Sequence, residues 1–308
     1  MKNDFEKKLE DILKKDQIKT QEPLSGHTTF KMGGKADFFV MPQSPEEIVE
    51  LIKLSKQQKV PFYVLGNGSN MLVGDKGYQG LIIQIGKGME HIEFGESTEE
   101  QTKVLVSAGI SLGKMAKMLA KKGLTGFEFA SGIPGTLGGA ITMNAGAYGG
   151  EIKDCILRAK VIDKEGHILI LEKDDLELGY RSSVIQKEGY IVVEAEFAFA
   201  SGVVEEIEKK MADLNRQRVE KQPLNYPSAG STFKRPEGYF AGKLIMDAGL
   251  AGYRVGDVMV SDKHCGFVVN VGSGTAKDAR QLIEDVSRIV YEKFQVKLEP
   301  EVRFLGEF

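Results

Sequence analysis

Glycine is concentrated in one short stretch of this chain. Residues 131–150 read SGIPGTLGGAITMNAGAYGG, and seven of these twenty residues are glycine. A glycine inside a helix or strand costs about 0.5–1 kcal/mol relative to alanine, because its backbone loses more conformational freedom on folding. So many glycines together are therefore expected where the backbone adopts unusual angles or where a large group lies directly against it.

A second glycine loop, GNGSN at residues 66–70, follows a predicted strand. It is not the Rossmann fingerprint, because the third glycine of that motif would fall at Met71 and no convincing helix follows. The loop instead offers consecutive backbone N–H groups and the side chains of Ser69 and Asn70, which suit a phosphate. Two such loops fit a dinucleotide cofactor, although the residues alone are equally compatible with a fold that is merely rich in loops.

Length and charge set further bounds. The chain has 308 residues, enough for two or three domains, and its net charge of −3 gives no general attraction for nucleic acid or anionic membranes. Apolar runs such as residues 81–85 are far shorter than the ~20 residues of a membrane span. The charged N-terminus lacks the apolar core of a signal peptide, so a cytoplasmic location is expected. Two cysteines and four scattered histidines predict neither a disulfide framework nor a metal site.

The pattern of elements is α+β, without a regular alternation of strands and helices. Strands are expected at residues 36–42, 61–66, 80–85, 103–109, 190–200, 266–272 and 296–305, and a hairpin around residues 164–166. Helices are expected near residues 45–58, 111–124, 202–222, 241–250 and 275–294. Ser44 and Glu47 predict a capping box at the first of these helices. The segment PLNYP, residues 223–227, is a probable domain boundary.

Seven motifs in order carry a resemblance to a known family. They are HTTFKMGGKADFFV, GNGSN, SGIPGTLGGAITMNAGAYG, YRSS, AGSTFKRP, VSDKHCGFVVN and LEPEVRF. The set resembles the UDP-N-acetylenolpyruvoylglucosamine reductase family over about residues 25 to 305, and the two glycine loops resemble the FAD-binding fold of the vanillyl-alcohol-oxidase type. No counterpart of the tyrosine-bearing loop of the longer subtype is visible, so the chain resembles the shorter subtype.

The resemblance implies both a fold and a reaction. The fold is α+β, with a two-lobed FAD-binding region at residues 1–219 (lobes about 1–85 and 86–219) and a C-terminal α+β substrate-binding domain at residues 220–308. Its last strand is expected to return toward the flavin. The implied reaction uses NADPH and non-covalently bound FAD to reduce UDP-N-acetylglucosamine enolpyruvate to UDP-N-acetylmuramate for peptidoglycan. No nucleic acid, membrane or obligate protein partner is implied.

The resemblance also assigns the cofactor contacts. Those residues are Gly66, Asn67, Gly68, Ser69, Asn70, Ser131, Gly132, Ile133, Pro134, Gly135, Thr136, Gly139, Asn144 and Arg303. No histidine or cysteine stands at a family-like covalent attachment position, which is why the FAD is expected to be non-covalent.

Three residues are the candidates for catalysis. A hydride added to the β-carbon of an enolpyruvyl group leaves negative charge on the α-carbon and its carboxylate, so the site needs a fixed cation and a proton donor. The resemblance implies Arg181 as the catalytic arginine, Ser231 as the proton donor and Glu301 as the acid residue that polarises the enolate. Taken singly, such residues are more often a surface arginine, a turn or cap serine and a carboxylate on a solvated strand edge. The alternation in residues 296–305 would place Leu298, Val302 and Phe304 on the face opposite Glu301.

A nucleotide sugar also needs cations for its diphosphate. The candidate substrate residues are Arg218, Lys221, Tyr226, Lys234, Arg235 and His264. A charged helix end and a structural histidine are the alternatives, and Arg235 stands where some relatives have asparagine. Tyr148 and Cys265 are interpreted as packing residues.

Two other functions remain open at this point. One is a flavin oxidase or dehydrogenase of the same fold that acts on a hydroxy acid or alcohol. The other is a nucleotide-sugar binding module without catalysis. The oxidase or dehydrogenase leaves the pair AGSTFK and LEPEVRF without a reason.

Overall fold

The computed structural model describes residues 2–308, which pack as two compact units. Of the described residues, unit 1 comprises residues 2–20, Phe38–Asn67 and Gly80–Gln217, and unit 2 comprises Gln21–Asp37, Gly68–Gln79 and Arg218–Phe308. Two short N-terminal segments therefore group with the C-terminal part of the chain. The predicted domain limits, which divide the chain at residue 219, stay a prediction.

Unit 1 is built on an antiparallel sheet with the strand order β12-β11-β13-β7-β6. Its strands are β6 (Ile92–Ser97), β7 (Thr102–Ser107), β11 (Ile156–Ile162), β12 (Ile168–Glu172) and β13 (Ile191–Ser201), and β8 (Leu124–Thr125) pairs with the end of β13. The predicted hairpin is confirmed, since β11 and β12 pair in register around residues 163–167. Inward-facing residues alternate along β13, as a half-buried strand requires.

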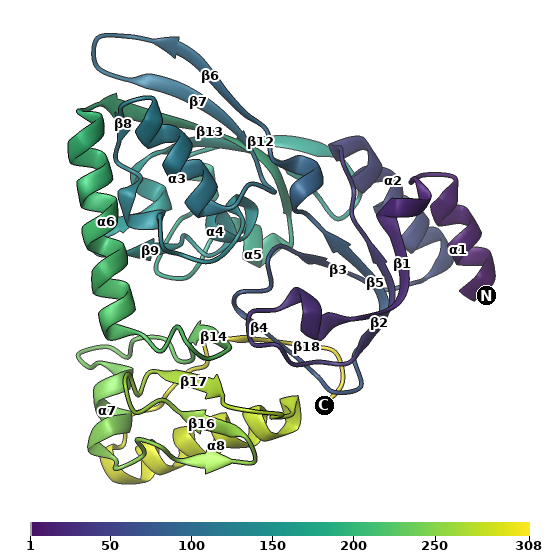
Figure 1. Ribbon diagram of the computed structural model, residues 1–308. Coiled ribbons are helices and arrows are strands. Elements are labelled where there is room, and N and C mark those ends of the chain that lie inside the picture. The colour runs from purple at the N-terminus through teal and green to yellow at the C-terminus, as the bar shows by residue number, and fades with distance from the viewer. Residues whose placement is uncertain (1) are drawn as a thin grey trace. The chain divides into compact units, whose positions relative to one another are not determined.

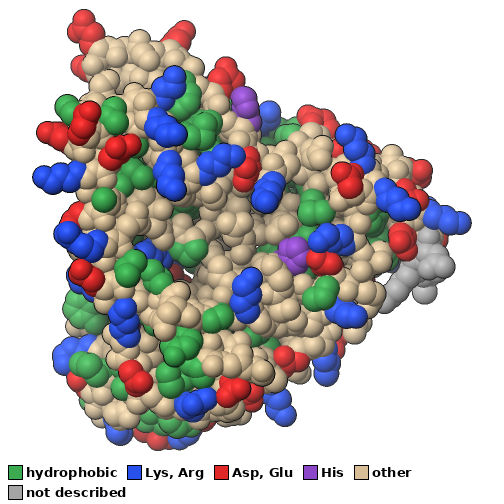
Figure 2. Space-filling model, in the orientation of Figure 1, with side chains coloured by type: hydrophobic (Ala, Val, Ile, Leu, Met, Phe, Trp, Pro, Cys, Tyr) green, Lys and Arg blue, Asp and Glu red, His purple; other side chains and the backbone are tan. Residues whose placement is uncertain are grey.

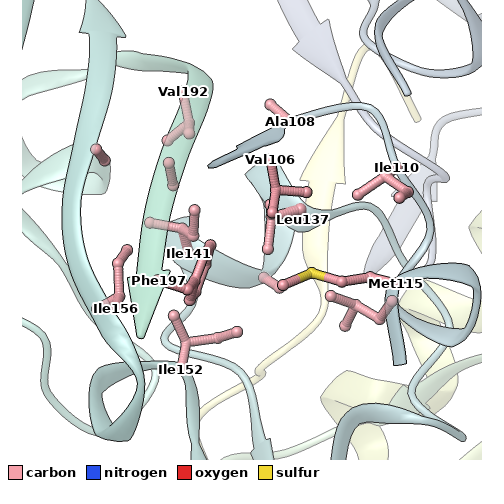
Figure 3. Close-up of a cluster of buried hydrophobic side chains, with 14 of the residues drawn as sticks. Val106, Ala108, Ile110, Met115, Leu137, Ile141, Ile152, Ile156, Val192 and Phe197 are labelled. Atoms are coloured by element: carbon pink, nitrogen blue, oxygen red, sulfur yellow. The ribbon is translucent and has the colours of Figure 1, made fainter. Parts of the chain in front are cut away.

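Two helices, α3 (Leu112–Lys121) and α4 (Leu137–Thr142), pack against this sheet (Figure 1). Figure 3 shows Leu137 and Ile141 of α4 among Val106 of β7 and Phe197 of β13. A Cβ atom on Gly138 would lie 3.1 Å from the Ala108 Cβ, so glycine allows α4 to lie this close to the end of β7. The sequence patterns did not indicate α4, because a six-residue helix with two glycines has no helical periodicity. The second glycine loop is thus anchored in the core.

A second sheet has the order β1-β2-β5-β3. Its strands are β1 (Ile18–Pro23), β2 (Lys35–Val40), β5 (Tyr78–Gln84) and β3 (Phe62–Leu65), and side chains of the helices α1 (Lys2–Glu10) and α2 (Pro45–Gln58) form one apolar cluster with side chains of β2 and β5. Ser44 Oγ accepts the Glu47 N–H at 3.3 Å, as predicted. The other half of the predicted capping box is wrong, since the Glu47 carboxylate accepts from Gln43 N at 2.7 Å.

Unit 2 contains a sheet with the order β14-β17-β16-β15. Its strands are β14 (Ser228–Ser231), β17 (Phe267–Asn270), β16 (Val258–Val260) and β15 (Arg254–Val255), and α7 (Ala241–Asp247) and α8 (Ala276–Phe294) lie beside it (Figure 1). A short parallel pair joins β4 (Met71–Val73) to β18 (Arg303–Leu305).

The helix α6 (Val204–Lys221) follows β13 directly, as expected for the shorter subtype, and α5 (Val184–Glu188) precedes β13.

The predicted last strand is wrong over most of its length. Only residues 303–305 form a strand, and Pro300 makes a single bridge to Phe233. Proline has no N–H to donate, so it interrupts a ladder at this point. Leu298 and Val302 are buried as expected, but Phe304 is 42% exposed.

The visible surface and the two cysteines show no feature that points to a particular function. Figure 2 shows basic and acidic side chains interspersed on the visible face. Within residues 2–308, no helix combines the length and the apolar character that a membrane crossing would need. Cys155 and Cys265 are both free and buried.

Candidate active site

The two glycine loops meet within unit 1. Gly66 directly follows β3, and a Cβ atom on it would collide with Thr136 Oγ1. Thr136 is the N-cap residue of α4 and is 2% exposed. The absence of a side chain at Gly66 is therefore what allows the first loop to lie against the second.

The second loop offers an unpaired hydroxyl. Ser131 Oγ is buried and has no hydrogen-bond partner among the described residues. Gly135 has a φ of 150°, a backbone angle that L side chains rarely adopt. An unpaired hydroxyl beside a backbone without side chains fits an anionic, flat cofactor such as FAD.

The other candidates of the second loop lie in the same segment. Pro134 and Gly139 are exposed, Gly132 and Ser131 are half-buried, and Ile133 packs partly against the core. Asn144 differs, because its buried side chain is fully used within the protein. Its amide donates to Glu151 Oε2 at 2.8 Å and to Gly179 O at 3.1 Å, and its Oδ1 accepts from Lys153 N at 3.0 Å.

Arg181 occupies a strained position in a tight turn of unit 1. Gly179 and Ser182 exchange backbone hydrogen bonds of 3.1 and 3.3 Å, and Arg181 has a φ of 52°. Turn positions with positive φ favour glycine or asparagine, and another residue there costs of order 1–3 kcal/mol. The Arg181 guanidinium carbon lies 5.2 Å from the centre of the Tyr180 ring.

Neighbouring side chains hold this turn in place. Ser183 Oγ donates at 2.7 Å to the carbonyl of Thr142, the last residue of α4, and Gln186 Nε2 donates to Arg181 O at 3.2 Å. The pKa of Glu151 is lowered, mainly by its hydrogen bond with Lys153, and the Arg181 charge contributes. The turn is therefore tied to the second glycine-rich segment at two points, Thr142 and Asn144.

In unit 2, the structure brings Ser231 and Glu301 onto neighbouring segments. Ser231 is exposed at the end of β14. The next residue, Thr232, accepts the Glu301 N–H at 2.8 Å through its carbonyl oxygen. Lys234 N donates to Glu299 O at 2.9 Å, so residues 231–234 run beside residues 299–301.

The first glycine loop also reaches this pair of segments. Asn70 Nδ2 donates to Glu301 O at 3.1 Å, and Arg303 N donates to Asn70 O at 3.0 Å. Gly68 has a φ of 58°, and a Cβ atom there would collide with His27 O. The contact between Asn70 and Glu301 was not predicted, because 231 residues separate them and no local pattern signals it.

The substrate candidates lie in unit 2, and Lys234, Arg235 and His264 have partners within the protein. Lys263 Nζ donates to Val219 O at 2.7 Å, at the end of α6 between Arg218 and Lys221. Lys234 Nζ lies 3.4 Å from a Glu299 carboxylate oxygen. The Arg235 guanidinium carbon lies 4.0 Å from the Phe240 ring centre. Tyr226 is 41% exposed.

His264, Cys265 and Tyr148 differ in their surroundings. His264 Nδ1 accepts from Gly266 N at 3.1 Å, and burial lowers the pKa of the imidazole, which favours its neutral form. Cys265 is buried, as predicted. The packing interpretation of Tyr148 is wrong, since this residue is 43% exposed with a φ of 53° between β9 (Gly146–Ala147) and β10 (Gly150–Glu151). Within residues 2–308, no group of three His, Cys, Asp or Glu residues could hold a metal ion.

Comparison with protein families defines the class. A family model of the FAD binding domain matches residues 36–172, and a model of the C-terminal domain of UDP-N-acetylenolpyruvoylglucosamine reductase matches residues 222–305. The fold and the converging glycine loops therefore define an FAD-dependent oxidoreductase. The predicted fold class, an FAD-binding region followed by a C-terminal α+β domain, is confirmed.

Curated relatives identify the family. The UDP-N-acetylenolpyruvoylglucosamine reductase of Lachnoclostridium phytofermentans is 55% identical over 307 residues, covering 100% of this chain and 99% of the relative. That of Agathobacter rectalis is 50% identical, with 100% of both chains covered. The chain belongs to the UDP-N-acetylenolpyruvoylglucosamine reductase family.

Solved structures agree with this assignment. The crystal structure of the reductase from Thermus caldophilus matches with a TM-score of 0.76 and 33% identity over 94% of this chain and 98% of that one. A glucose dehydrogenase, Phl p 4.0202, matches with a TM-score of 0.50 and 14% identity over 65% of this chain and 44% of that one, which shows a shared fold alone.

Proposed function

We propose that this chain reduces the enolpyruvyl ether of UDP-N-acetylglucosamine enolpyruvate to UDP-N-acetylmuramate, a peptidoglycan precursor, with NADPH as the reductant. Membership of the reductase family over the full chain supports the substrate. The structural observation that carries the proposal is the backbone hydrogen bond between Thr232 and Glu301, which sets Ser231 and Glu301 on adjacent segments.

The cofactor is held without a covalent bond. We assign its contacts to residues 66–69, to residues 131–136 and 139, and to Arg303, with Asn144 supporting them. Asn70 is assigned through its backbone N–H alone, because its side-chain amide donates to Glu301 O. When bound, FAD takes a hydride from NADPH and supplies one to the β-carbon of the substrate. Backbone N–H groups suit its diphosphate, and the missing Cβ atoms leave room for its ring system.

Each catalytic side chain then has one task. Arg181 binds the substrate carboxylate with its guanidinium fork and stabilises the charge that develops there. Ser231 donates its hydroxyl proton to the α-carbon, so that one hydride and one proton convert the C=C bond to a single bond. Glu301 polarises the enolate beside the reacting carbon.

Binding of the nucleotide diphosphate is assigned to the cations at the start of the substrate-binding domain, residues 220–308, and at the end of α6. Arg218 and Lys221 are the first candidates, with Lys234, Arg235 and Tyr226 next. His264 holds its own turn through Gly266, and its role toward substrate rests on the family resemblance alone. The reaction needs only small molecules and fits a cytoplasmic enzyme without an obligate protein partner.

A product assay tests the function. Purified protein with NADPH and UDP-N-acetylglucosamine enolpyruvate is expected to consume one NADPH per product, and the product mass should exceed that of the substrate by two hydrogens. Oxygen uptake with a hydroxy acid or an alcohol, without turnover of the nucleotide sugar, would instead support a flavin oxidase. Binding of the sugar without NADPH consumption would support a binding module.

A further inference from the structure

The peptide backbone of Glu301 is held on both sides by residues distant in the sequence. Its N–H donates to Thr232 O at 2.8 Å, and its carbonyl accepts from Asn70 Nδ2 at 3.1 Å. Both partners belong to unit 2. We propose that Asn70 is a positioning residue for Glu301, which deepens the proposed function and rests on it.

Residues 295–302 need such contacts because they have no regular structure. The segment follows α8 through Gln295, which has a φ of 55°, and it becomes a strand only at Arg303. Outside a helix or sheet, a segment depends on individual hydrogen bonds for its conformation. The two hydrogen bonds to the Glu301 backbone are among those that fix the position of its Cα atom, from which the side chain extends.

Asn70 is itself held firmly enough to serve as a support. Its carbonyl accepts the Arg303 N–H at 3.0 Å, and the next residues, Met71 to Val73, pair in parallel with β18. Farther along, the two Asp75 carboxylate oxygens accept the N–H groups of Ala276 and Lys277, each at 2.9 Å, at the start of α8. Residues 70–75 are thus bonded to the rest of unit 2 at both ends.

The chemistry of asparagine suits this position. Its amide nitrogen donates to the Glu301 carbonyl, which neither a carboxylate nor an alanine side chain can do. The neighbouring Gly68 and Ser69 are assigned to the cofactor. The loop GNGSN therefore has two roles within five residues, since Gly68 and Ser69 meet the cofactor and Asn70 sets the backbone of the acid residue.

Hydrogen–deuterium exchange of the FAD-loaded protein tests the contact directly. Asn70→Ala should speed exchange of the amides of residues 301–303 by about 2- to 12-fold, the worth of one hydrogen bond. Asn70→Asp keeps the size of the side chain but not the donor, so it should do the same if Asn70→Ala fails to fold. The control Gln281→Ala, which removes an exposed amide on α8 away from the candidate site, should leave this exchange unchanged. Unchanged exchange in a folded Asn70 variant would overturn the proposal.

A double-mutant cycle then tests the functional link. Asn70→Ala should slow the reoxidation of the reduced enzyme by the enolpyruvyl sugar, and it should have little further effect in a Glu301→Gln background. Full multiplication of the two effects would show that Asn70 does not act through Glu301. If Glu301→Gln alone changes nothing, the proposed role of Glu301 fails, whereas the exchange measurement still decides whether Asn70 positions that segment.

Discussion

The turn that carries Arg181 and the segment that carries Glu301 are held in different ways. Arg181 lies in a four-residue turn closed by Gly179 and Ser182, and its strained backbone is fixed by near neighbours such as Gln186. Glu301 lies in an irregular segment fixed by Thr232 and Asn70, which are 69 and 231 residues away in sequence. The Arg181 turn is closed by its own residues and supported by bonds to Thr142 and Asn144, whereas the Glu301 segment has no closed turn and depends on its two distant partners.

The largest effect is expected at Ser231, beside the Glu301 segment. Ser231→Ala should lower the rate of reoxidation by the enolpyruvyl sugar by about 10²- to 10⁴-fold, because a general acid is lost. Reduction by NADPH should stay close to normal, since no proton donor to the α-carbon is needed there. Ser231→Cys should recover part of the loss. Stopped-flow absorbance of each half-reaction measures this, and equal slowing of both halves would mean that Ser231 only shapes the pocket.

Arg181→Lys probes the strained turn with the charge retained. It should lower turnover by about 10²- to 10³-fold, because a lysine cannot reproduce the two parallel hydrogen bonds of the guanidinium fork. Tyr180→Phe, which keeps the adjacent ring, serves as the matched control and should be close to normal. If the lysine variant is as active as the control, Arg181 is not a catalytic residue, and its strained backbone has no explanation in catalysis.

Replacing the cationic residues at the end of α6 should weaken substrate binding and leave the rate of the chemical step unchanged. Lys221→Ala and Arg218→Ala should each raise KM for the nucleotide sugar by roughly 10- to 150-fold, the worth of one charge-assisted contact. Lys209→Ala, on the exposed side of the same helix, should leave KM unchanged. If KM is unchanged in all three variants, the cations belong to a solvated helix end.

The smallest effect is expected at Glu128, which fixes the start of the second glycine loop. Its buried carboxylate accepts from Thr125 Oγ1 at 2.6 Å and from Gly126 N at 3.1 Å, and it pairs with Lys210 at 3.1 Å. Although burial raises the pKa of Glu128, these bonds outweigh that effect and lower it. The carboxylate therefore stabilises the fold at neutral pH, and this stabilisation is lost as the pH falls through the lowered pKa.

Glu128→Gln keeps a neutral acceptor and should cost about 1 kcal/mol in the free energy of unfolding at pH 7. The difference from the wild type should shrink as the pH falls. Urea unfolding at pH 7 and at acid pH measures both. Lys210→Ala, which removes only the exposed partner, should cost less. A constant difference at all pH values would contradict the assignment.

The sequence predicted most elements and the candidate residues, but not how the residues are held. Motif order identified Arg181, Ser231 and Glu301 singly. The pairing of residues 231–234 with 299–301 was not predictable, because it depends on long-range backbone bonds that have no local pattern. The strand expected at residues 296–305 was wrong over residues 296–302, since the apolar alternation begins before Pro300 whereas the ladder forms only at residues 303–305. Tyr148 was misjudged because an aromatic residue between glycines does not reveal its exposure.

The central claim is that this chain passes electrons from NADPH through bound FAD to the enolpyruvyl sugar. An anaerobic absorbance titration of the purified protein tests it most directly. We expect a yellow protein with about one FAD per chain that NADPH bleaches and that UDP-N-acetylglucosamine enolpyruvate then recolours in a one-to-one ratio. A folded protein that binds no FAD, or a bleached protein that oxygen recolours but the enolpyruvyl sugar does not, would contradict the account.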